Sequence, residues 1–262
     1  MPELPEVEIM TRNARRWLSG QTLAALEVLD DALLPAASAA AVAGAHIGEA
    51  RRRGKYLCLP LGTQTLILHF RMTGKVVLET EPRRHVRARI HTDAHTVAFV
   101  DTRRLGCAWL LPTSEVSAFF DAIPLGPEPW PMPRDGAWWA ARLSGTRSAI
   151  KPALLRQDRI AGLGNIAVVE ILHRAKLHPA RTVPSLTASD FAAIAAAAPV
   201  FIAHVLAVES GPEIHYVNEG AAIPTPFLVY GRAGLACTCG STIERTVQSG
   251  RATFSCPNCQ RR

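Results

Sequence analysis

The 262-residue sequence is poor in charge, because only 19% of its residues are charged whereas 48% are hydrophobic. A disordered chain needs the opposite balance, so this composition excludes extended disorder and favours a buried core. The sequence also lacks internal repeats and low-complexity tails. Its length allows one large domain or two ordinary domains.

Targeting and membrane segments are also missing. The first residues, MPELPEVE, are acidic and rich in proline, which differs from the basic and apolar start of a leader peptide. No apolar run reaches the roughly 18 residues that a membrane helix needs. The stretch from Phe191 to Val208 comes closest, but Asp190, His204 and its many alanines predict a soluble helix. We therefore expect a cytoplasmic protein without a membrane partner.

Acidic residues are in the minority, with 22 Asp and Glu against 29 Lys and Arg. The net charge is +7 and the sequence pI is about 9.4. Such a balance favours a polyanionic partner, with nucleic acid first and an anionic membrane second. The alternative is an ordinary soluble enzyme that happens to be basic.

The distribution of the six cysteines does not favour a disulfide framework. Cys58 and Cys107 stand alone in apolar, strand-like runs, whereas the other four cluster near the C-terminus. This pattern is typical of a reduced, cytosolic protein with a metal site.

The four clustered cysteines are Cys237, Cys239, Cys256 and Cys259, in the motifs CTCG and CPNC. Four thiolates in two close pairs suit one tetrahedral, structural Zn²⁺ in a ribbon of two hairpins. The first pair is C-x-C rather than C-x-x-C, which tightens its turn. The alternative is a hairpin without metal that carries spare thiols.

The order of patterns along the chain predicts an α+β fold. Pro5 suits the first turn of a helix, and Val7, Met10, Ala14 and Trp17 then follow at helical spacing. This helix would hold the N-terminus in a fixed place. Short apolar runs between turn signals, from residue 23 to residue 111, predict a β-sandwich or barrel.

The second half of the chain has a helical period. We expect helices at about 138–143, 148–156, 165–175 and 188–208, followed by a strand-like section that carries the cysteines. The predicted divisions are an N-terminal sandwich domain at 1–123, a proline-rich linker at 124–136, a helical domain at 137–226 and a zinc ribbon at 227–262.

A glycine-rich turn precedes one of these helices. Gly162 and Gly164 flank Leu163, and Asn165 opens the helix. Glycines let a backbone approach an anion, and the N-terminus of a helix offers unpaired N–H groups. The alternative is a simple corner that Asn165 caps. The motif is not a dinucleotide fingerprint, because no strand precedes it.

Basic residues gather at several predicted turns. They are Arg51 to Arg53, Lys55, His69, Arg71, Lys75, Arg103, Arg104 and, at a hairpin tip, Arg251. Each cluster alone could be a solvated loop. Together, with Met72 and Leu105 interleaved, they match the phosphate contacts and apolar wedges of proteins that distort DNA.

These motifs resemble one family, the formamidopyrimidine-DNA glycosylase and endonuclease VIII enzymes of base-excision repair. The matches run in order over nearly the whole chain: MPELPEVE, RRGKYL, HFRMTG, DTRRLG, IKPALLRQDRIAGLGNI, EILHRAKLHP, VYGR and GRATFSCPNCQ. The resemblance implies a β-sandwich domain, a helix–two-turns–helix domain and a zinc ribbon. It also implies that damaged double-stranded DNA lies between the domains with one nucleotide flipped out. Nothing in the sequence indicates an oligomer, so we expect a monomer.

The resemblance assigns roles to individual residues. The catalytic residues would be Pro2, Glu3 and Lys55, and Glu6 would brace the catalytic end. The DNA-binding residues would be His69, Met72, Arg103, Arg104, Asn165 and Arg251, of which Met72 and Arg103 would fill the hole left by the flipped nucleotide. Once Met1 is removed, Pro2 is a secondary amine that can attack the sugar and form a cationic iminium. Glu3 can then shuttle protons for β,δ-elimination.

Several positions depart from the family. Leu105 replaces a common aromatic residue, Ala167 to Val169 replace a stretch that often holds tyrosine and aspartate, and the loop YVNEGAAIPTPFL looks short. Three hypotheses follow: excision of oxidised purines, the same chemistry on oxidised pyrimidines or other lesions, and binding of lesions without excision. The overall motifs favour the first.

Overall fold

The structure is a computed structural model that describes residues 2–214 and 226–261. These residues form two compact units, the first made of 2–123 and 209–214, the second of 124–208 and 226–261. The structure differs here from the predicted helical domain at 137–226, because residues 209–214 belong to the first unit. Glu213 pairs there with Lys75 and with Arg83 at 2.9 Å, and Asn13 donates to the Gly211 carbonyl at 3.0 Å.

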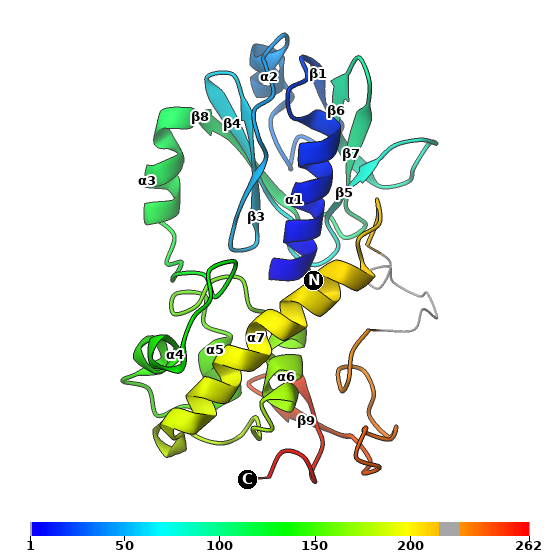
Figure 1. Ribbon diagram of the computed structural model, residues 1–262. Helices are drawn as coiled ribbons and strands as arrows, with labels where there is room; N and C mark the ends of the chain where they lie inside the picture. The colour runs from blue at the N-terminus through cyan, green and yellow to red at the C-terminus, as the bar shows by residue number, and fades with distance from the viewer. Residues whose placement is uncertain (1, 215–225, 262) are drawn as a thin grey trace. The chain divides into compact units, whose positions relative to one another are not determined.

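The first unit is a sandwich of two antiparallel four-stranded sheets, as the sequence predicts (Figure 1). One sheet has the order β1-β6-β7-β5 and the other the order β2-β3-β4-β8. The strands are β1 (Leu23–Val28), β2 (Arg51–Arg53), β3 (Tyr56–Leu61), β4 (Gln64–His69), β5 (Lys75–Leu78), β6 (Val86–Thr92), β7 (Thr96–Val100) and β8 (Cys107–Pro112).

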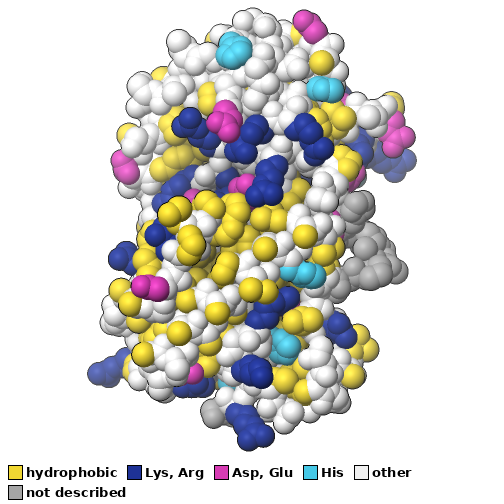
Figure 2. Space-filling view, in the orientation of Figure 1, with side chains coloured by type: hydrophobic (Ala, Val, Ile, Leu, Met, Phe, Trp, Pro, Cys, Tyr) yellow, Lys and Arg dark blue, Asp and Glu magenta, His cyan; other side chains and the backbone are white. Residues whose placement is uncertain are grey.

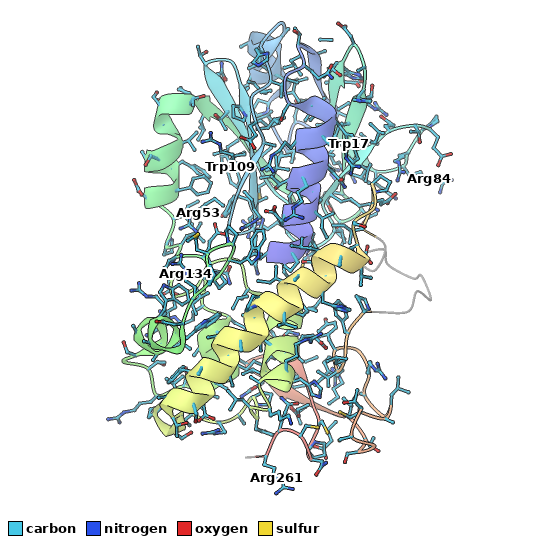
Figure 3. All side chains as sticks on the ribbon, in the orientation of Figure 1. Trp17, Arg53, Arg84, Trp109, Arg134 and Arg261 are labelled. Atoms are coloured by element: carbon cyan, nitrogen blue, oxygen red, sulfur yellow. The ribbon has the colours of Figure 1, made fainter. Side chains whose placement is uncertain are left out.

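Alternating apolar residues fill the space between the sheets. Phe70, which follows β4, stacks on Phe99 of β7 with ring centroids 5.9 Å apart, and both are buried. The outer face of the second sheet carries an aromatic cluster in which Trp109 packs beside Phe119 of the short helix α3 (Val116–Asp121) (Figure 3). The unit also holds α2 (Ala36–Ala39), η1 (Ala40–Val42) and η2 (Thr113–Glu115).

Helix α1 (Leu4–Leu18) packs against β5 of one sheet and against β2 and β3 of the other. It therefore covers the side of the sandwich where the edge strands β5 and β2 lie. Its apolar positions recur at helical spacing, and Leu4, Val7 and Leu18 have no exposed surface. This burial stabilises the start of the chain against fraying.

The second unit is mainly helical. Its elements are α4 (Gly136–Leu143), α5 (Ile150–Leu154), α6 (Asn165–Arg174), η3 (Val183–Ser185), α7 (Ala188–Val208), β9 (Glu244–Gln248) and β10 (Arg251–Ser255). The expected helices are confirmed, with α5 shorter than predicted. The proline-rich segment before α4 packs on this unit: the Gly126 N–H donates to the Gln157 carbonyl at 2.7 Å, and Arg134 lies over the Trp138 ring.

By length and composition alone, α7 is long and apolar enough to cross a membrane, which corrects the expectation that no run is long enough. The mean hydropathy of its best window is 2.3, because Val, Ile, Leu and Phe are interspersed among its alanines. Its buried side chains, such as Ile194 and Ile202, belong to the core of the unit, where α7 packs against α4 and α6. Hydrophobic side chains also gather on its outer face (Figure 2).

Candidate functional site

The predicted catalytic residues Pro2 and Glu3 lie at the ordered start of α1. Both are buried, and Glu3 occupies the N-cap position in an extended conformation. The backbone N–H of Glu3 donates to Oε2 of Glu6 at 2.6 Å. Burial, and then the neighbouring Glu3 carboxylate, raise the pKa of Glu6 to about 8, so Glu6 is mainly protonated at neutral pH.

A buried ion pair ties α1 to the turn that carries Lys55. Glu8 accepts from Arg52 Nε at 3.0 Å, and Arg52 Nη1 donates to the Gly54 carbonyl at 3.0 Å. Gly54 has a φ of +57°, a left-handed conformation that favours glycine and reverses the chain between β2 and β3. Lys55, only 8% exposed, therefore has a fixed backbone position in the same unit as Pro2 and Glu3.

His69 ends β4 directly opposite Tyr56, and their ring centroids are 4.6 Å apart. Its Nδ1 accepts the backbone N–H of Arg71 at 3.1 Å, which leaves the imidazole proton on Nε2. Burial, and then the positive charges of Arg71 and Lys55, lower the pKa of His69 to about 4. His69 is therefore a neutral hydrogen-bond donor over the physiological pH range.

The turn after His69 presents Met72, whose surface is 41% exposed. Arg71 has a φ of +51°, and the Gly74 N–H donates to the Phe70 carbonyl at 2.9 Å. A Cβ on Gly74 would lie 2.6 Å from that carbonyl oxygen, so only glycine fits this tight turn. An apolar side chain is thus held out in solvent by a closely packed backbone.

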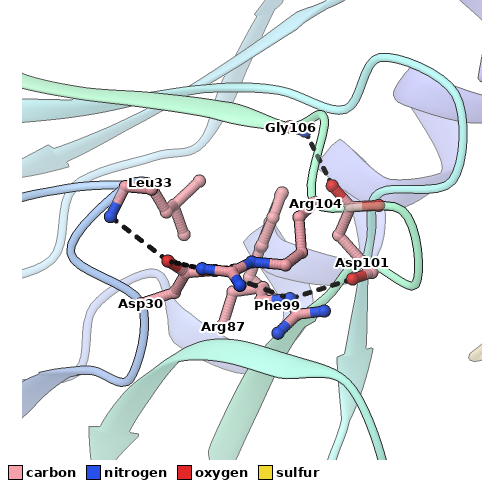
Figure 4. Close-up of a pocket in the computed structure, with 8 residues that line it drawn as sticks. Asp30, Leu33, Arg87, Phe99, Asp101, Arg104 and Gly106 are labelled. Atoms are coloured by element: carbon pink, nitrogen blue, oxygen red, sulfur yellow. Dashed lines mark hydrogen bonds and ion pairs between the residues drawn. The ribbon is translucent and has the colours of Figure 1, made fainter.

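A second turn, Asp101–Gly106, presents Arg103, Arg104 and Leu105. All three are exposed, and Leu105 is 42% exposed. The guanidinium of Arg104 is already engaged, because it donates to both oxygens of Asp30 at 2.9 and 2.8 Å (Figure 4). The hydrogen bonds from Arg104 lower the pKa of Asp30. The DNA contact predicted for Arg104 stays a prediction, and it would use the remaining N–H groups.

Asn165 is the first residue of α6, and Gly164 rather than Asn165 takes the N-cap position. The interpretation of Asn165 as the cap of this helix is therefore wrong. Its Nδ2 instead donates to the carbonyl of Ala252 at 3.0 Å, while its buried Oδ1 has no partner among the described residues. Gly162 has a φ of +96°, which explains the glycine in this turn.

Arg251 begins β10 beside the hairpin tip and is exposed, as the sequence predicts. Sequence reasoning missed the residue that supports it, Lys151. Lys151 of α5 has no exposed surface, and its Nζ donates to the Ala252 carbonyl at 3.0 Å and to Thr253 Oγ1 at 2.7 Å. Burial, and then the charge of Arg251, lower the pKa of Lys151 to about 8. Asn165 and Lys151 thus converge on the residue next to Arg251.

The four predicted zinc ligands come together in the second unit. Their sulfur atoms all lie within 4.8 Å of one another, with Cys239 and Cys256 at 3.4 Å and Cys237 and Cys259 at 3.9 Å. Tetrahedral Zn–S bonds of about 2.3 Å place sulfurs about 3.8 Å apart, so the set fits one structural Zn²⁺. The shorter C-x-C pair still reaches this geometry.

Glu170 of α6 is a second buried residue that sequence reasoning missed. It has no exposed surface, and it accepts the backbone N–H groups of Leu228, Val229 and Tyr230 at 3.0, 2.8 and 2.9 Å. Arg174 neutralises it at 2.6 Å. The carboxylate therefore fixes the segment that leads into the zinc ribbon.

Two of the departures from the family have a structural outcome. Ala167, Val168 and Val169 are fully buried, and Val169 packs with Val229 and Phe254 in the core that joins α6 to the ribbon. Leu105 is exposed beside Arg103. Most of the loop YVNEGAAIPTPFL, predicted to be short, lies outside the described residues.

Fold and site together define a protein with a β-sandwich unit and a helical unit that ends in a zinc ribbon. Three family models match: the formamidopyrimidine-DNA glycosylase N-terminal domain at residues 1–108, the corresponding H2TH domain at 125–214, and a zinc finger found in FPG and IleRS at 238–262. The chain belongs to the formamidopyrimidine-DNA glycosylase family.

Curated relatives share the full length of the chain. Formamidopyrimidine-DNA glycosylases of Cereibacter sphaeroides and Gluconobacter oxydans are 36% and 37% identical, each with 100% of both chains covered. A solved Lactococcus lactis enzyme in complex with DNA containing an abasic site is 30% identical, with a TM-score of 0.88 over 99% of this chain and 100% of that one. The same enzyme bound to Fapy-dG-containing DNA, as a G226P mutant, is 31% identical with a TM-score of 0.87, and both chains are covered fully.

Proposed function

We propose that the protein is a bifunctional DNA glycosylase and abasic-site lyase that excises oxidised purines from double-stranded DNA. Its relatives carry the glycosylase name, and the similar Lactococcus lactis structures hold DNA with an abasic site or Fapy-dG. The observation that supports the chemistry best is the buried, ordered Pro2–Glu3 start of α1. A frayed terminus could not position a nucleophile.

Pro2 is the proposed nucleophile once Met1 has been removed. An α-amino group has a pKa of about 7.7–8.0, so a useful fraction is neutral near pH 7. Its nitrogen attacks sugar C1′, and the bond from C1′ to the damaged base breaks with its electron pair leaving on the base. Protonation of the ring oxygen opens the sugar. The secondary amine can then form only a cationic iminium, which withdraws electrons from C2′.

Strand cleavage follows from that electron sink. Loss of a C2′ proton expels the 3′ phosphate, and a second elimination expels the 5′ phosphate. Glu3 is the proposed group that carries protons to the sugar oxygen and from C2′. A largely protonated Glu6 supports this assignment, because it hydrogen-bonds the backbone of Glu3 without adding a second negative charge beside it.

The DNA contacts are proposals built on the same site. Lys55, Asn165 and Arg251 would bind phosphates, and His69 would do so as a neutral Nε2–H donor. Met72 and Arg103 would fill the space of the flipped nucleotide, with Leu105 beside them. A protein that makes these contacts would act on chromosomal DNA, so we place it in the cytoplasm in association with the nucleoid.

Borohydride trapping on damaged duplexes tests this function, because reduction turns the iminium into a stable covalent adduct. The duplexes carry 8-oxoguanine, a formamidopyrimidine, a dihydropyrimidine or an abasic site. We expect adducts on the purine lesions that disappear in Pro2→Gly and fall strongly in Glu3→Gln. Adducts mainly on the dihydropyrimidine would move the specificity to pyrimidines. Binding without any adduct would refute the catalytic assignment.

A further inference from the structure

One buried carboxylate in the first unit holds two exposed turns together. Asp101 is only 1% exposed, and its Oδ2 accepts the backbone N–H groups of Leu105 at 2.8 Å and Gly106 at 2.7 Å. Its Oδ1 accepts the N–H of Arg103 at 3.2 Å and the hydroxyl of Thr73. The carboxylate thus accepts from both turns at once.

Thr73 connects this carboxylate to the turn of Met72. Its hydroxyl donates to Asp101 and also accepts the backbone N–H of Arg103 at 3.2 Å. Thr73 directly follows Met72 in the chain. A single polar cluster, made of Asp101 and Thr73, therefore fixes the backbone beside all three exposed side chains, Met72, Arg103 and Leu105.

The backbone of Asp101 is itself anchored to β6 and its preceding residue. Its N–H donates to the His85 carbonyl at 3.0 Å, and its own carbonyl accepts from Arg87 Nε at 2.9 Å (Figure 4). Gly106 closes the turn so tightly that an added Cβ would lie 2.6 Å from Phe99 and 3.1 Å from Asp101 Oδ2. The carboxylate is therefore held by the sandwich and cannot follow a moving loop.

We propose that Asp101 is a positioning residue that makes Met72, Arg103 and Leu105 act as one rigid wedge in DNA. This inference rests on the proposed function, which assigns these side chains to the space of the flipped nucleotide. Unstacking base pairs costs free energy, and ordering loose side chains on binding adds to that cost. A preorganised wedge therefore binds more tightly than a loose one. A turn anchored by four hydrogen bonds removes the cost of ordering.

The proposal requires a carboxylate at residue 101 rather than any polar group of the same size. All the groups that face its two oxygens are donors, so an acceptor-only side chain satisfies each of them. In Asp101→Asn, an amide NH₂ at the Oδ2 position would leave the N–H groups of Leu105 and Gly106 without their acceptor, and at the Oδ1 position it would remove the acceptor of the Thr73 hydroxyl. The shape of the side chain is unchanged, and a control that also removes one negative charge separates the loss of hydrogen bonds from the loss of charge.

The first measurement follows wedge insertion directly. A duplex carries a tetrahydrofuran abasic analogue, with 2-aminopurine opposite the analogue as a fluorescent report of unstacking. We expect Asp101→Asn to bind with a reduced fluorescence rise and an affinity lower by about tenfold to a hundredfold. Thr73→Val, which breaks the bridge from the other turn, should give the same defect. The exposed Asp93→Asn is the matched control and should behave as wild type.

The second measurement separates positioning from general damage. Borohydride trapping is compared on an abasic site in duplex DNA and in a single strand, where no stacked partner needs to be displaced. We expect Asp101→Asn to lose trapping on the duplex only. On a Met72→Ala/Arg103→Ala/Leu105→Ala background, Asp101→Asn should add no further loss.

Two results would overturn the proposal: parallel loss on duplex and single strand, or wild-type fluorescence with wild-type trapping. Failure of the proposed function is distinguishable, since it would remove trapping by the wild-type protein. The fluorescence measurement does not depend on Pro2 chemistry and would still decide the role of Asp101.

Discussion

Replacing Glu170 with alanine should detach the zinc ribbon from α6. The carboxylate accepts three backbone N–H groups between 2.8 and 3.0 Å and pairs with Arg174 at 2.6 Å, all at a residue without exposed surface. Glu170→Ala therefore takes the acceptor from three backbone N–H groups, of which that of Val229 is buried, and removes the carboxylate partner of the largely buried Arg174 guanidinium.

The expected loss of stability is large for one side chain. A hydrogen bond to a charged group contributes about 1.5–3 kcal/mol, and breaking one partner of a buried pair costs about 3–5 kcal/mol. These contributions overlap, so we expect about 4 kcal/mol for Glu170→Ala. For a unit of this size, that corresponds to a melting temperature lower by roughly 15 °C. Glu170→Gln keeps one acceptor oxygen and should lose about half as much.

Amide hydrogen exchange is the assay that locates the effect. If the segment opens locally, about 4 kcal/mol lowers the protection of the Leu228, Val229 and Tyr230 amides by roughly a thousandfold. Amides of the sandwich unit should keep their protection, and the exposed Glu244→Ala should serve as a neutral control. Unchanged protection at these three amides in Glu170→Ala would refute the reasoning.

Two further predictions concern the start of α1 and the metal. Because burial raises the pKa of Glu6 from 4.5 to about 8, its contribution to stability is complete below pH 4.5 and is lost as the pH rises through 8. The free energy of unfolding of Glu6→Gln, measured in urea, should equal that of the wild type near pH 4.5 and exceed it at pH 9. Hydrogen exchange of the α1 amides should show the same difference. Identical pH curves for the two proteins would contradict the burial argument. Metal analysis should find one zinc per chain, and chelation should lower amide protection in β9 and β10 but not in β3 and β4; a zinc-free protein with unchanged ribbon amides would contradict the ligand assignment.

Local signals in the sequence predict much of the fold. Apolar residues at helical spacing place α1 and α6, short apolar runs place the sandwich strands, and the paired cysteines place the ribbon. Each of these signals lies within a few residues, and backbone hydrogen bonding or metal geometry converts it into structure. The exposed tips that carry Met72, Arg103 and Arg251 were predictable for the same reason.

The partners that fix those tips could not be predicted, because they lie far apart in the sequence. Thr73 and Asp101 are 28 residues apart, Glu8 and Arg52 are 44 apart, and Lys151 meets Thr253 across 102 residues. The aspartate at position 101 predicts a local turn, because aspartate side chains often accept backbone N–H groups of the turn that follows them. It does not predict the hydrogen bond from Thr73, which belongs to a different turn. Burial of Lys151 has no sequence signal at all.

The adjacent residues Arg103 and Arg104 show why residue type alone leaves a role undecided. The sequence gives them the same chemistry and the same turn, yet Arg104 takes a left-handed conformation with a φ of +54° and turns its guanidinium onto Asp30. Arg103 contributes its backbone N–H to Thr73 and Asp101 and keeps an exposed side chain. One arginine therefore braces the turn from outside while the other is presented by it. In the proposed wedge, the pair of Arg104 with Asp30 would hold the turn in place while the exposed side chain of Arg103 enters the DNA.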